Sequence, residues 1–281
     1  MNEGSFRERR VELGETELRC SRIALAAGYG IGERGVETAF DHGINVFYWG
    51  SVRRDSFARG LRSVAKRGRE GIVLVVQSYS RLAGLMERSL DSALAKLGFD
   101  HADLLLLGWW NHPPPPRIRD QARALVAKGK ARAVLVSCHR RASFAAYLAD
   151  PAYDAIMVRY NAAHPGTEED VFPHLAGRPD GTFPGGRRAG VVSYTATSWG
   201  RLLKARRTPP GERTPTAADC YRFVLTSPHV DVCLAGPKDD AELQGALAAL
   251  ASRPMYPDEL AWMKRVGRGK ARGTRSRIRG S

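Results

Sequence analysis

Eight short apolar runs, each followed by a polar or amphipathic stretch, dominate this sequence of 281 residues. The runs are continuous rather than alternating in polarity, which is typical of parallel strands that are covered on both faces. They occupy residues 22–28, 44–49, 72–79, 102–110, 131–138, 155–161, 190–196 and 230–236. Parallel strands need crossover connections, and eight strand–helix units close naturally into a barrel. We therefore predict the α/β class and a (β/α)8 TIM barrel.

The stretches between the runs have the spacing of amphipathic helices. Two of them end at a glycine, Gly43 and Gly98, as helices often do. The alternative architecture, a doubly wound open sheet, needs a glycine-rich fingerprint after the first strand. The sequence there, AAGYGIG at residues 26–32, does not have that spacing.

The composition limits the class of protein. No run of about 18 apolar residues is present, so we expect no membrane span. The first residues are charged rather than apolar, which predicts a cytoplasmic protein. Four cysteines are spaced too irregularly for a zinc site, and we expect free thiols and no metal.

The net charge of +15 is concentrated in part at the C-terminus. Residues 267–281 contain six basic residues, no acidic residue and one large aliphatic residue, Ile278. Such a segment cannot bury a core, and we expect one barrel domain over residues 1–266 and a disordered basic tail over 267–281. The tail either binds nucleic acid or another anionic surface through phosphate contacts, or only improves solubility.

Four segments in order resemble the aldo-keto reductases. Residues 12–25 are similar to the N-terminal hairpin and first strand of that family, and residues 129–139 to its fifth strand. Residues 190–203 resemble its seventh strand and the following turn, and residues 221–243 its last helix, eighth strand and phosphate loop. The resemblance spans residues 12–252 and implies a barrel preceded by a short hairpin.

The resemblance also implies an activity, the reduction of carbonyl groups with NADPH. In this family a Tyr donates the proton, a Lys assists it, an Asp holds the Lys, and a His orients the substrate. The equivalent positions here are Arg53 for the Tyr, Gln77 for the Lys, Tyr48 for the Asp and Gly108 for the His. All four are changed, so the resemblance implies an impaired or inactive reductase.

The positions that bind the cofactor in this family are kept in part. Ser137 and Tyr194 match the family pattern, whereas Cys138 and Met157 replace its Asn and Gln. We expect NADP(H) to bind with reduced affinity, if at all. The candidate cofactor residues are Ser137, Asn161, Tyr194, Thr195, Gly200, Leu202, Gly236 and Lys238.

Three functional readings stay open on the sequence. The first is a divergent barrel that binds a small-molecule ligand at a neutral, aromatic mouth formed by Tyr48, Trp49, Gln77, Tyr79, Trp109 and Trp110. Only one of Tyr48 and Trp49 can face the barrel interior. The second is an active oxidoreductase with a relocated proton donor, Tyr48 or His112, and the third is a non-catalytic interaction protein. Arg159 either binds an anionic ligand or pairs with an acid such as Asp239 or Asp103.

Overall fold

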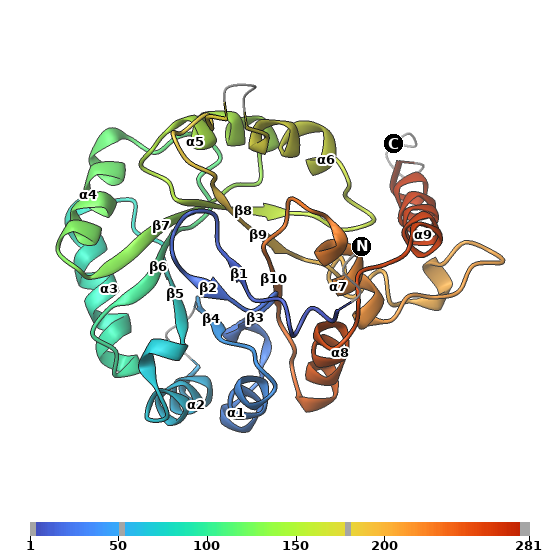
Figure 1. Cartoon of the computed structure of the whole chain (residues 1–281), viewed down its shortest axis with the longest axis horizontal. Helices are drawn as coiled ribbons and strands as arrows, with labels where there is room; N and C mark the ends of the chain where they lie inside the picture. Colours follow the sequence, from blue (N-terminus) through green and yellow to red (C-terminus); the bar gives the residue numbers. More distant parts are fainter. Residues whose placement is uncertain (1–3, 51–53, 178–180, 276–281) are drawn as a thin grey trace, which may run out of the picture.

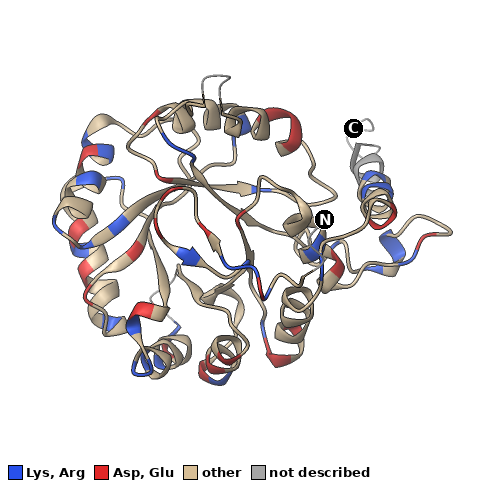
Figure 2. Ribbon diagram, viewed as in Figure 1, with Lys and Arg blue, Asp and Glu red and all other residues tan. Residues whose placement is uncertain are grey.

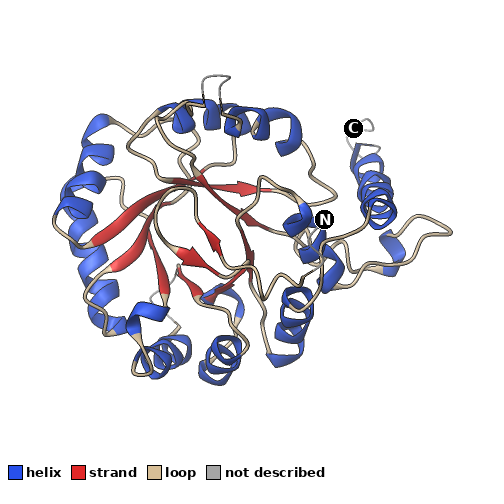
Figure 3. Cartoon of the chain, viewed as in Figure 1, coloured by secondary structure: helices blue, strands red, loops and turns tan. Residues whose placement is uncertain are grey.

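Eight parallel strands form a closed barrel, as the sequence predicts (Figures 1 and 3). The computed structural model describes residues 4–50, 54–177 and 181–275. The strands follow one another around the barrel in chain order, and the last pairs with the first. They are β3 (Ile23–Ala26), β4 (Val46–Trp49), β5 (Val73–Ser78), β6 (Ala102–Leu107), β7 (Ala131–Ser137), β8 (Ala155–Arg159), β9 (Gly190–Tyr194) and β10 (Val232–Ala235).

Helices surround the barrel on its outer side (Figure 3). The α-helices are α1 (Glu33–Asp41), α2 (Asp55–Ala65), α3 (Ala83–Leu97), α4 (Pro116–Ala127), α5 (Phe144–Ala149), α6 (Thr167–Asp170), α7 (Ala217–Thr226), α8 (Asp240–Leu250) and α9 (Pro257–Arg275). Short 3-10 turns η1 (Ala27–Tyr29), η2 (Arg69–Gly71), η3 (Arg141–Ser143), η4 (Phe172–Leu175) and η5 (Ala205–Arg207) lie between them. Figure 2 shows that most charged residues lie on the helices and loops, while the strands are mostly uncharged.

Strand residues alternate between two apolar layers. On β5, for example, Val73 and Val75 belong to the cluster inside the barrel, and Leu74 and Val76 to the cluster between strands and helices. The alternation arises because successive side chains of a strand point to opposite faces. It fixes which residue at each strand end can reach the mouth.

A short hairpin closes the N-terminal end of the barrel. Strands β1 (Val11–Glu12) and β2 (Arg19–Cys20) pair antiparallel, which confirms the hairpin implied by the resemblance. Leu13 and Leu18 of the hairpin are fully buried and join the inner cluster. Gly190 makes this possible, because a side chain there would collide with Leu13. The opposite end, where the strands finish, is the one left to bind ligands.

Three aspartates also brace the N-terminal end. The carboxylates of Asp103, Asp154 and Asp231 accept hydrogen bonds from the backbone N–H of Leu74, Val134 and Val191, at 2.8, 2.7 and 2.8 Å. Each acid thus ties its own strand region to the preceding strand. Arginines neutralise them, and the pairs include Arg69–Asp103 at 3.0 Å, Arg123–Asp154 at 2.8 Å and Arg188–Asp231 at 3.1 Å.

The C-terminal helix continues beyond the boundary expected at residue 266. Helix α9 includes residues 267–275, which fall in the segment expected to be a disordered tail. Gly267 lies against the backbone of Ala162, since a side chain at this position would collide with it. Residues 276–281 of the expected tail lie outside the described residues. No helix in the described part of the chain is both long and apolar enough to cross a bilayer.

Candidate functional site: the barrel mouth

The innermost layer at the mouth contains one residue from each of six neighbouring strands. The alternation of inner and outer positions extends to the strand ends, so that these residues follow the inner side chains of the barrel core. They are Tyr48, Gln77, Gly108, Ser137, Arg159 and Tyr194. Five of them were expected at the mouth as family-equivalent positions, and the layer also includes Arg159.

Tyr48 and Gln77 contact each other within this layer. The Tyr48 hydroxyl donates a hydrogen bond to the side-chain oxygen of Gln77. Burial first, and then the neighbouring Tyr79, raises the pKa of Tyr48 above its ordinary value of 10. A buried phenol with a raised pKa and a neutral partner is a weak acid, so this arrangement lacks the electrostatic help that a lysine would give.

The amide of Gln77 also explains the glycine at position 108. A side chain on Gly108 would collide with the Gln77 amide. The nitrogen of the Gln77 amide is buried and has no hydrogen-bond partner among the described residues. Gln77 therefore occupies space beside Gly108 that a larger residue would need.

Trp49 does not belong to the mouth, contrary to the expectation of a site that includes it. Its ring lies in the outer layer, 6.3 Å from the ring of Phe57 on α2. Tyr48 takes the inward position, because adjacent strand residues face opposite ways. Trp110 likewise packs against the outer cluster, with the Arg81 guanidinium 4.0 Å from its ring centre.

A second polar cluster joins three strand ends on the other side of the mouth. The Tyr194 hydroxyl lies 3.0 Å from Nδ1 of His139, and Nη2 of Arg159 lies 3.2 Å from the same nitrogen. Since a guanidinium can only donate, Nδ1 is the acceptor and the neutral ring carries its proton on Nε2. Burial and the charge of Arg159 both lower the pKa of His139, which favours this neutral form.

Of the two alternatives for Arg159, the pairing with Asp103 or Asp239 does not occur. Asp103 lies at the opposite end of the barrel and pairs with Arg69. Asp239 caps helix α8, where its carboxylate accepts the backbone N–H of Glu242 at 2.9 Å. The mouth is also not neutral, because it contains the Arg159 guanidinium.

Large aromatic side chains lie exposed around these clusters. Trp109 is 58% exposed and Trp199 is 49% exposed. The Trp109 ring lies 6.4 Å from that of His139, and the Arg159 guanidinium lies 4.8 Å from the ring centre of Trp199. Tyr79 extends the series on the side of Trp109, at 5.7 Å between ring centres.

The backbone of the mouth loops is strained. Trp109, Thr195, Ser198 and Trp199 have φ angles of 58°, 63°, 51° and 53°. Bulky residues rarely adopt this left-handed region, and such residues cluster at functional sites. The strain therefore marks the same loops as the exposed tryptophans.

The two remaining catalytic candidates are His112 and Arg53. His112 is exposed on the loop after β6, and its Nδ1 lies 3.2 Å from Nη1 of Arg140. Arg53, the position equivalent to the family's Tyr, lies outside the described residues.

Several candidate cofactor residues are engaged within the protein. The Ser137 hydroxyl accepts the backbone N–H of Trp109 at 2.9 Å. Asn161 is fully buried, and its amide donates to the carbonyl of Thr195 at 2.8 Å. Leu202 is fully buried, and Gly200 adopts a φ of 71° in the same turn. These groups organise the loops, and only part of their polar capacity is left for a ligand.

The loop after β10 fits a phosphate group poorly. Lys238 is exposed, but its ammonium group already pairs with Glu242 at 2.9 Å. Acidic residues, Asp240 and Glu242, occupy the first turn of α8 behind the capping Asp239. Gly236 lies under the ring of Tyr29, since a side chain at this glycine would collide with that ring. Negative charge at this helix start opposes the binding of a phosphate.

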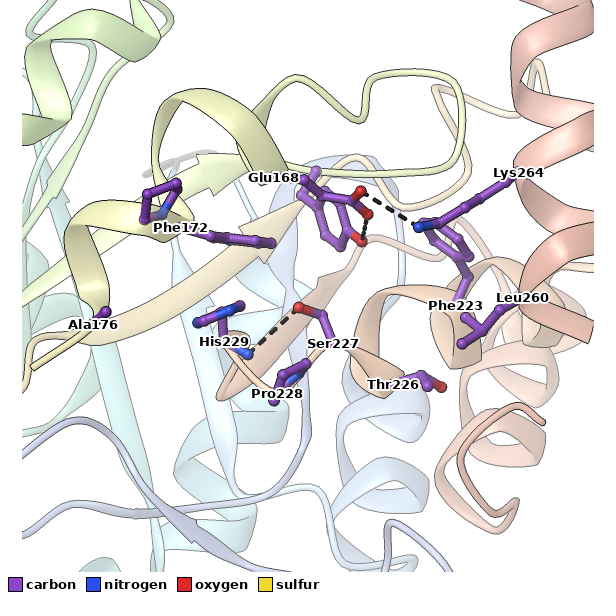
Figure 4. Close-up of a pocket in the computed structure, with 12 residues that line it drawn as sticks. Glu168, Phe172, Ala176, Phe223, Thr226, Ser227, Pro228, His229, Leu260 and Lys264 are labelled. Atoms are coloured by element: carbon purple, nitrogen blue, oxygen red, sulfur yellow. Dashed lines mark hydrogen bonds and ion pairs between the residues drawn. The ribbon is translucent and has the colours of Figure 1, made fainter. Parts of the chain in front are cut away.

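A pocket that the sequence did not predict lies on the flank of the barrel (Figure 4). It has a volume of about 430 Å³ and lies between α6, η4, α7 and α9. Three of its polar side chains, Tyr160, Glu168 and Lys264, are paired with one another. Tyr160 donates to Glu168 at 2.6 Å, and Glu168 lies 3.5 Å from the ammonium of Lys264. We therefore place the candidate site at the mouth.

The described residues include no group of three His, Cys, Asp or Glu side chains that could hold a metal ion. The four cysteines are buried and unbridged. Burial raises the pKa of Cys138, which lies near the mouth, and makes it a poor nucleophile.

His139 and Trp199 are the mouth residues that the sequence reasoning missed. Arg159 and Tyr194 pair across β8 and β9, and alternation along each strand turns both side chains inward. This pattern could have indicated a polar cluster at that side of the mouth. The contact with His139 depends on the loop after β7, for which the sequence carries no signal.

Comparison with known proteins agrees with this architecture. No family model matches the chain. An aldo-keto reductase from Bacillus halodurans in its holo form superimposes with a TM-score of 0.77 at 17% identity, over 92% of this chain and 96% of that one. An aldo/keto reductase from Klebsiella pneumoniae in complex with NADP and acetate gives 0.72 at 21% identity, over 92% and 94%. Another from the same organism, in complex with NADPH, gives 0.70 at 20% identity, over 95% of both chains. The chain therefore has the fold of the aldo-keto reductases.

Proposed function

We propose that this protein binds a small molecule at the barrel mouth and does not reduce carbonyl groups by the usual route of aldo-keto reductases. The observation that carries the proposal is the pair formed by Tyr48 and Gln77. A neutral amide cannot stabilise the charge that develops when a tyrosine gives up its proton. Removing one such preorganised group typically lowers an enzyme's rate about a hundredfold to a thousandfold.

A nicotinamide cofactor remains part of the proposal, at reduced affinity. The two similar structures from Klebsiella pneumoniae contain NADP and NADPH, and the barrel here superimposes on both. The ion pair between Lys238 and Glu242 and the acidic first turn of α8 argue against tight binding of a phosphate-bearing cofactor. Met157, on the inner face of β8, offers no hydrogen bond to a carboxamide.

A fluorescence titration with NADPH and NADH, together with an assay of aldehyde reduction, tests the proposal. We expect weak or no quenching of the tryptophans by either cofactor, and no reduction of common aldehydes above the uncatalysed rate. Clear NADPH-dependent turnover that disappears in Tyr48→Phe would overturn the proposal and identify Tyr48 as the proton donor. Tyr256→Phe is the matched control, because Tyr256 is an exposed tyrosine on the loop before α9.

The same assay tests the other relocated donor. Turnover that survives in Tyr48→Phe but is lost in His112→Gln would assign the role to His112. The contact of His112 with Arg140 makes this the weaker of the two candidates.

The basic C-terminal segment supports a third candidate function, an interaction with nucleic acid or an anionic surface. A chain that ends before residue 267 should then bind anionic vesicles or duplex DNA less tightly than the full chain, with a difference that shrinks as salt is added. Equal binding by both chains would exclude this function of the segment.

A further inference from the structure

We propose that Arg159, with His139 and Tyr194, binds the carboxylate of a small planar ligand, and that Trp109 and Trp199 pack against its ring. The proposal rests on the ligand-binding function proposed above and names the chemical class of the ligand. It starts from the Arg159 guanidinium at the mouth, which has no counter-charge in the part of the chain that the structure describes.

Arg159 ends β8 on the inner side of the barrel and is half-buried. Its guanidinium lies 3.2 Å from Nδ1 of His139 and 4.8 Å from the ring centre of Trp199, and it also forms a hydrogen bond with the Tyr194 hydroxyl. No carboxylate of the described residues forms an ion pair with it, whereas Arg69 and Arg188 at the opposite end pair with Asp103 and Asp231. A half-buried charge without a counter-charge is costly, and a bound anion would remove that cost.

The surroundings of Arg159 are positive as well. Burial lowers the pKa of His164, and the charges of Arg159, Arg201 and Arg141 lower it further. The same two effects, burial and Arg159, lower the pKa of His139. Arg141 is itself paired with Asp170 at 2.5 Å, so the cation nearest to both rings is Arg159, and it is this charge that attracts a negative ligand.

The donors fit a carboxylate. A guanidinium presents parallel N–H groups that match two carboxylate oxygens, and Nε of Arg159 is buried without a partner among the described residues. The proton of neutral His139 is on Nε2, because Nδ1 faces the Arg159 guanidinium at 3.2 Å and a guanidinium can only donate. The cluster therefore offers an imidazole N–H beside the guanidinium.

The exposed tryptophan rings beside the cluster suit a planar ligand. Trp109 and Trp199 expose about half or more of their surface, and both are held at positive φ. Both rings border the polar cluster. The centre of the Trp109 ring lies 6.4 Å from that of His139, and the Arg159 guanidinium lies over the ring of Trp199. Exposed aromatic faces next to a cation recognise planar anions by stacking and charge together.

The test is a calorimetric or fluorescence titration of the full chain with three probes: benzoate, benzamide and inorganic phosphate. We expect benzoate to bind, benzamide to bind at least about tenfold more weakly because it lacks the charge, and phosphate to bind more weakly because it lacks the ring. Equal binding of benzoate and benzamide would overturn the role of the charge. Equal binding of benzoate and phosphate would overturn the role of the tryptophans, and no saturable binding of benzoate would overturn the whole proposal.

Variants locate the site. Arg159→Gln should weaken benzoate about tenfold or more, and Arg88→Gln, which removes the same charge from an exposed position on α3, should leave it unchanged. Should Arg159→Gln fail to fold, Arg159→Lys is the second variant. It keeps the charge but loses the parallel N–H groups of the guanidinium, and we expect it to weaken benzoate binding by a smaller factor. Unchanged affinity in a folded Arg159 variant would overturn the assignment. An NADPH-dependent reductase activity would refute the proposed function but would leave these titrations unaffected, so the two failures are distinguishable.

Discussion

The hydroxyl of Tyr48 on β4 donates a hydrogen bond to the side-chain oxygen of Gln77 on the neighbouring strand β5. These are the positions at which the resemblance to aldo-keto reductases implies an Asp and a Lys. The two replacements are mutually consistent, because an ammonium without its carboxylate would be a lone buried charge. By this resemblance, the pair would place a neutral contact where the family has an ionic one.

Gly108 and Gln77 should be energetically coupled. Gly108→Ala inserts a methyl group into the space of the Gln77 amide and should cost about 1–3 kcal/mol in the free energy of unfolding, as overpacking does. In a Gln77→Ala background the same change should be nearly neutral. Urea unfolding of the two single variants and the double variant measures the coupling, and additive costs would show that the two residues do not compete for this space.

Restoring the lysine alone should destabilise the barrel. Gln77→Lys places an ammonium at a position that is 8% exposed, with a phenol as its neighbour, and should cost several kcal/mol. Gln77→Met is the uncharged control of similar length. Adding Tyr48→Asp to Gln77→Lys should recover part of the loss, and thermal unfolding measures both steps. A Gln77→Lys variant as stable as the wild type would refute this account of the coupled replacement.

Restoring all four equivalent positions tests lost chemistry directly. The variant combines Tyr48→Asp, Arg53→Tyr, Gln77→Lys and Gly108→His. If only these side chains limit the reaction, it should reduce aldehydes with NADPH faster than the unmodified protein by about a hundredfold or more. Absence of any gain in a folded variant would mean that weak cofactor binding also limits the reaction.

The strained backbone at Trp109 should be measurable. Trp109→Ala and Trp109→Gly both remove the ring, but only glycine relaxes the backbone at a φ of 58°. The glycine variant should therefore be about 1 kcal/mol more stable than the alanine variant, and both should bind benzoate more weakly than the wild type. Chemical unfolding of the pair gives the difference, and an alanine variant of equal or higher stability would show that position 109 stores no strain.

A substitution at the N-terminal end of the barrel should lower stability without changing ligand binding at the mouth. Asp154 accepts the backbone N–H of Val134 and pairs with Arg123 at 2.8 Å and Arg187 at 2.6 Å. Asp154→Asn leaves these arginines without their charge partner and should cost about 3–5 kcal/mol. Asp91→Asn removes an exposed pair with Lys130 and should cost at most about 1 kcal/mol. Benzoate affinity in the folded protein should be the same for both, and a specific loss in Asp154→Asn would contradict the separation.

The attachment of α9 should depend on pH through Glu259. Burial raises the pKa of this carboxyl group, but hydrogen bonds from Arg222, the backbone of Tyr256 and Arg253 outweigh it and lower the pKa to about 2. A lowered folded pKa adds stability above the ordinary value of 4.5, and this stability is lost as pH falls through about 2. Glu259→Gln should therefore cost about 2 kcal/mol near pH 7, allowing for partial exposure.

The same comparison near pH 3 provides the control. There the unfolded chain is already protonated at Glu259 and the difference between wild type and Glu259→Gln should shrink by roughly half or more. Urea unfolding at both pH values gives the two differences. A difference that does not change with pH would mean that Glu259 acts through packing rather than charge.

The sequence alone determined the barrel and the order of its strands. Each apolar run and each helical stretch is a local pattern, and eight of them in succession leave few ways to cover every strand on both faces. The same local rule, alternation along a strand, predicted that only one of Tyr48 and Trp49 faces inward. It also brought Gln77 and Gly108 to the mouth, as the family-equivalent positions implied.

Only the tertiary structure decided what these residues contact. Which of Tyr48 and Trp49 turns inward depends on the register of β4 between its neighbours. Tyr48 faces inward, and Trp49 lies in the outer cluster and therefore outside the site. The meeting of Arg159, His139 and Tyr194 joins residues from three strand ends that are up to 55 positions apart in the chain. Barrel closure and the path of loops set such contacts, and neither is encoded in a local pattern. The Arg159 guanidinium, which forms no ion pair with a carboxylate of the described residues, can for this reason be identified only in the folded chain.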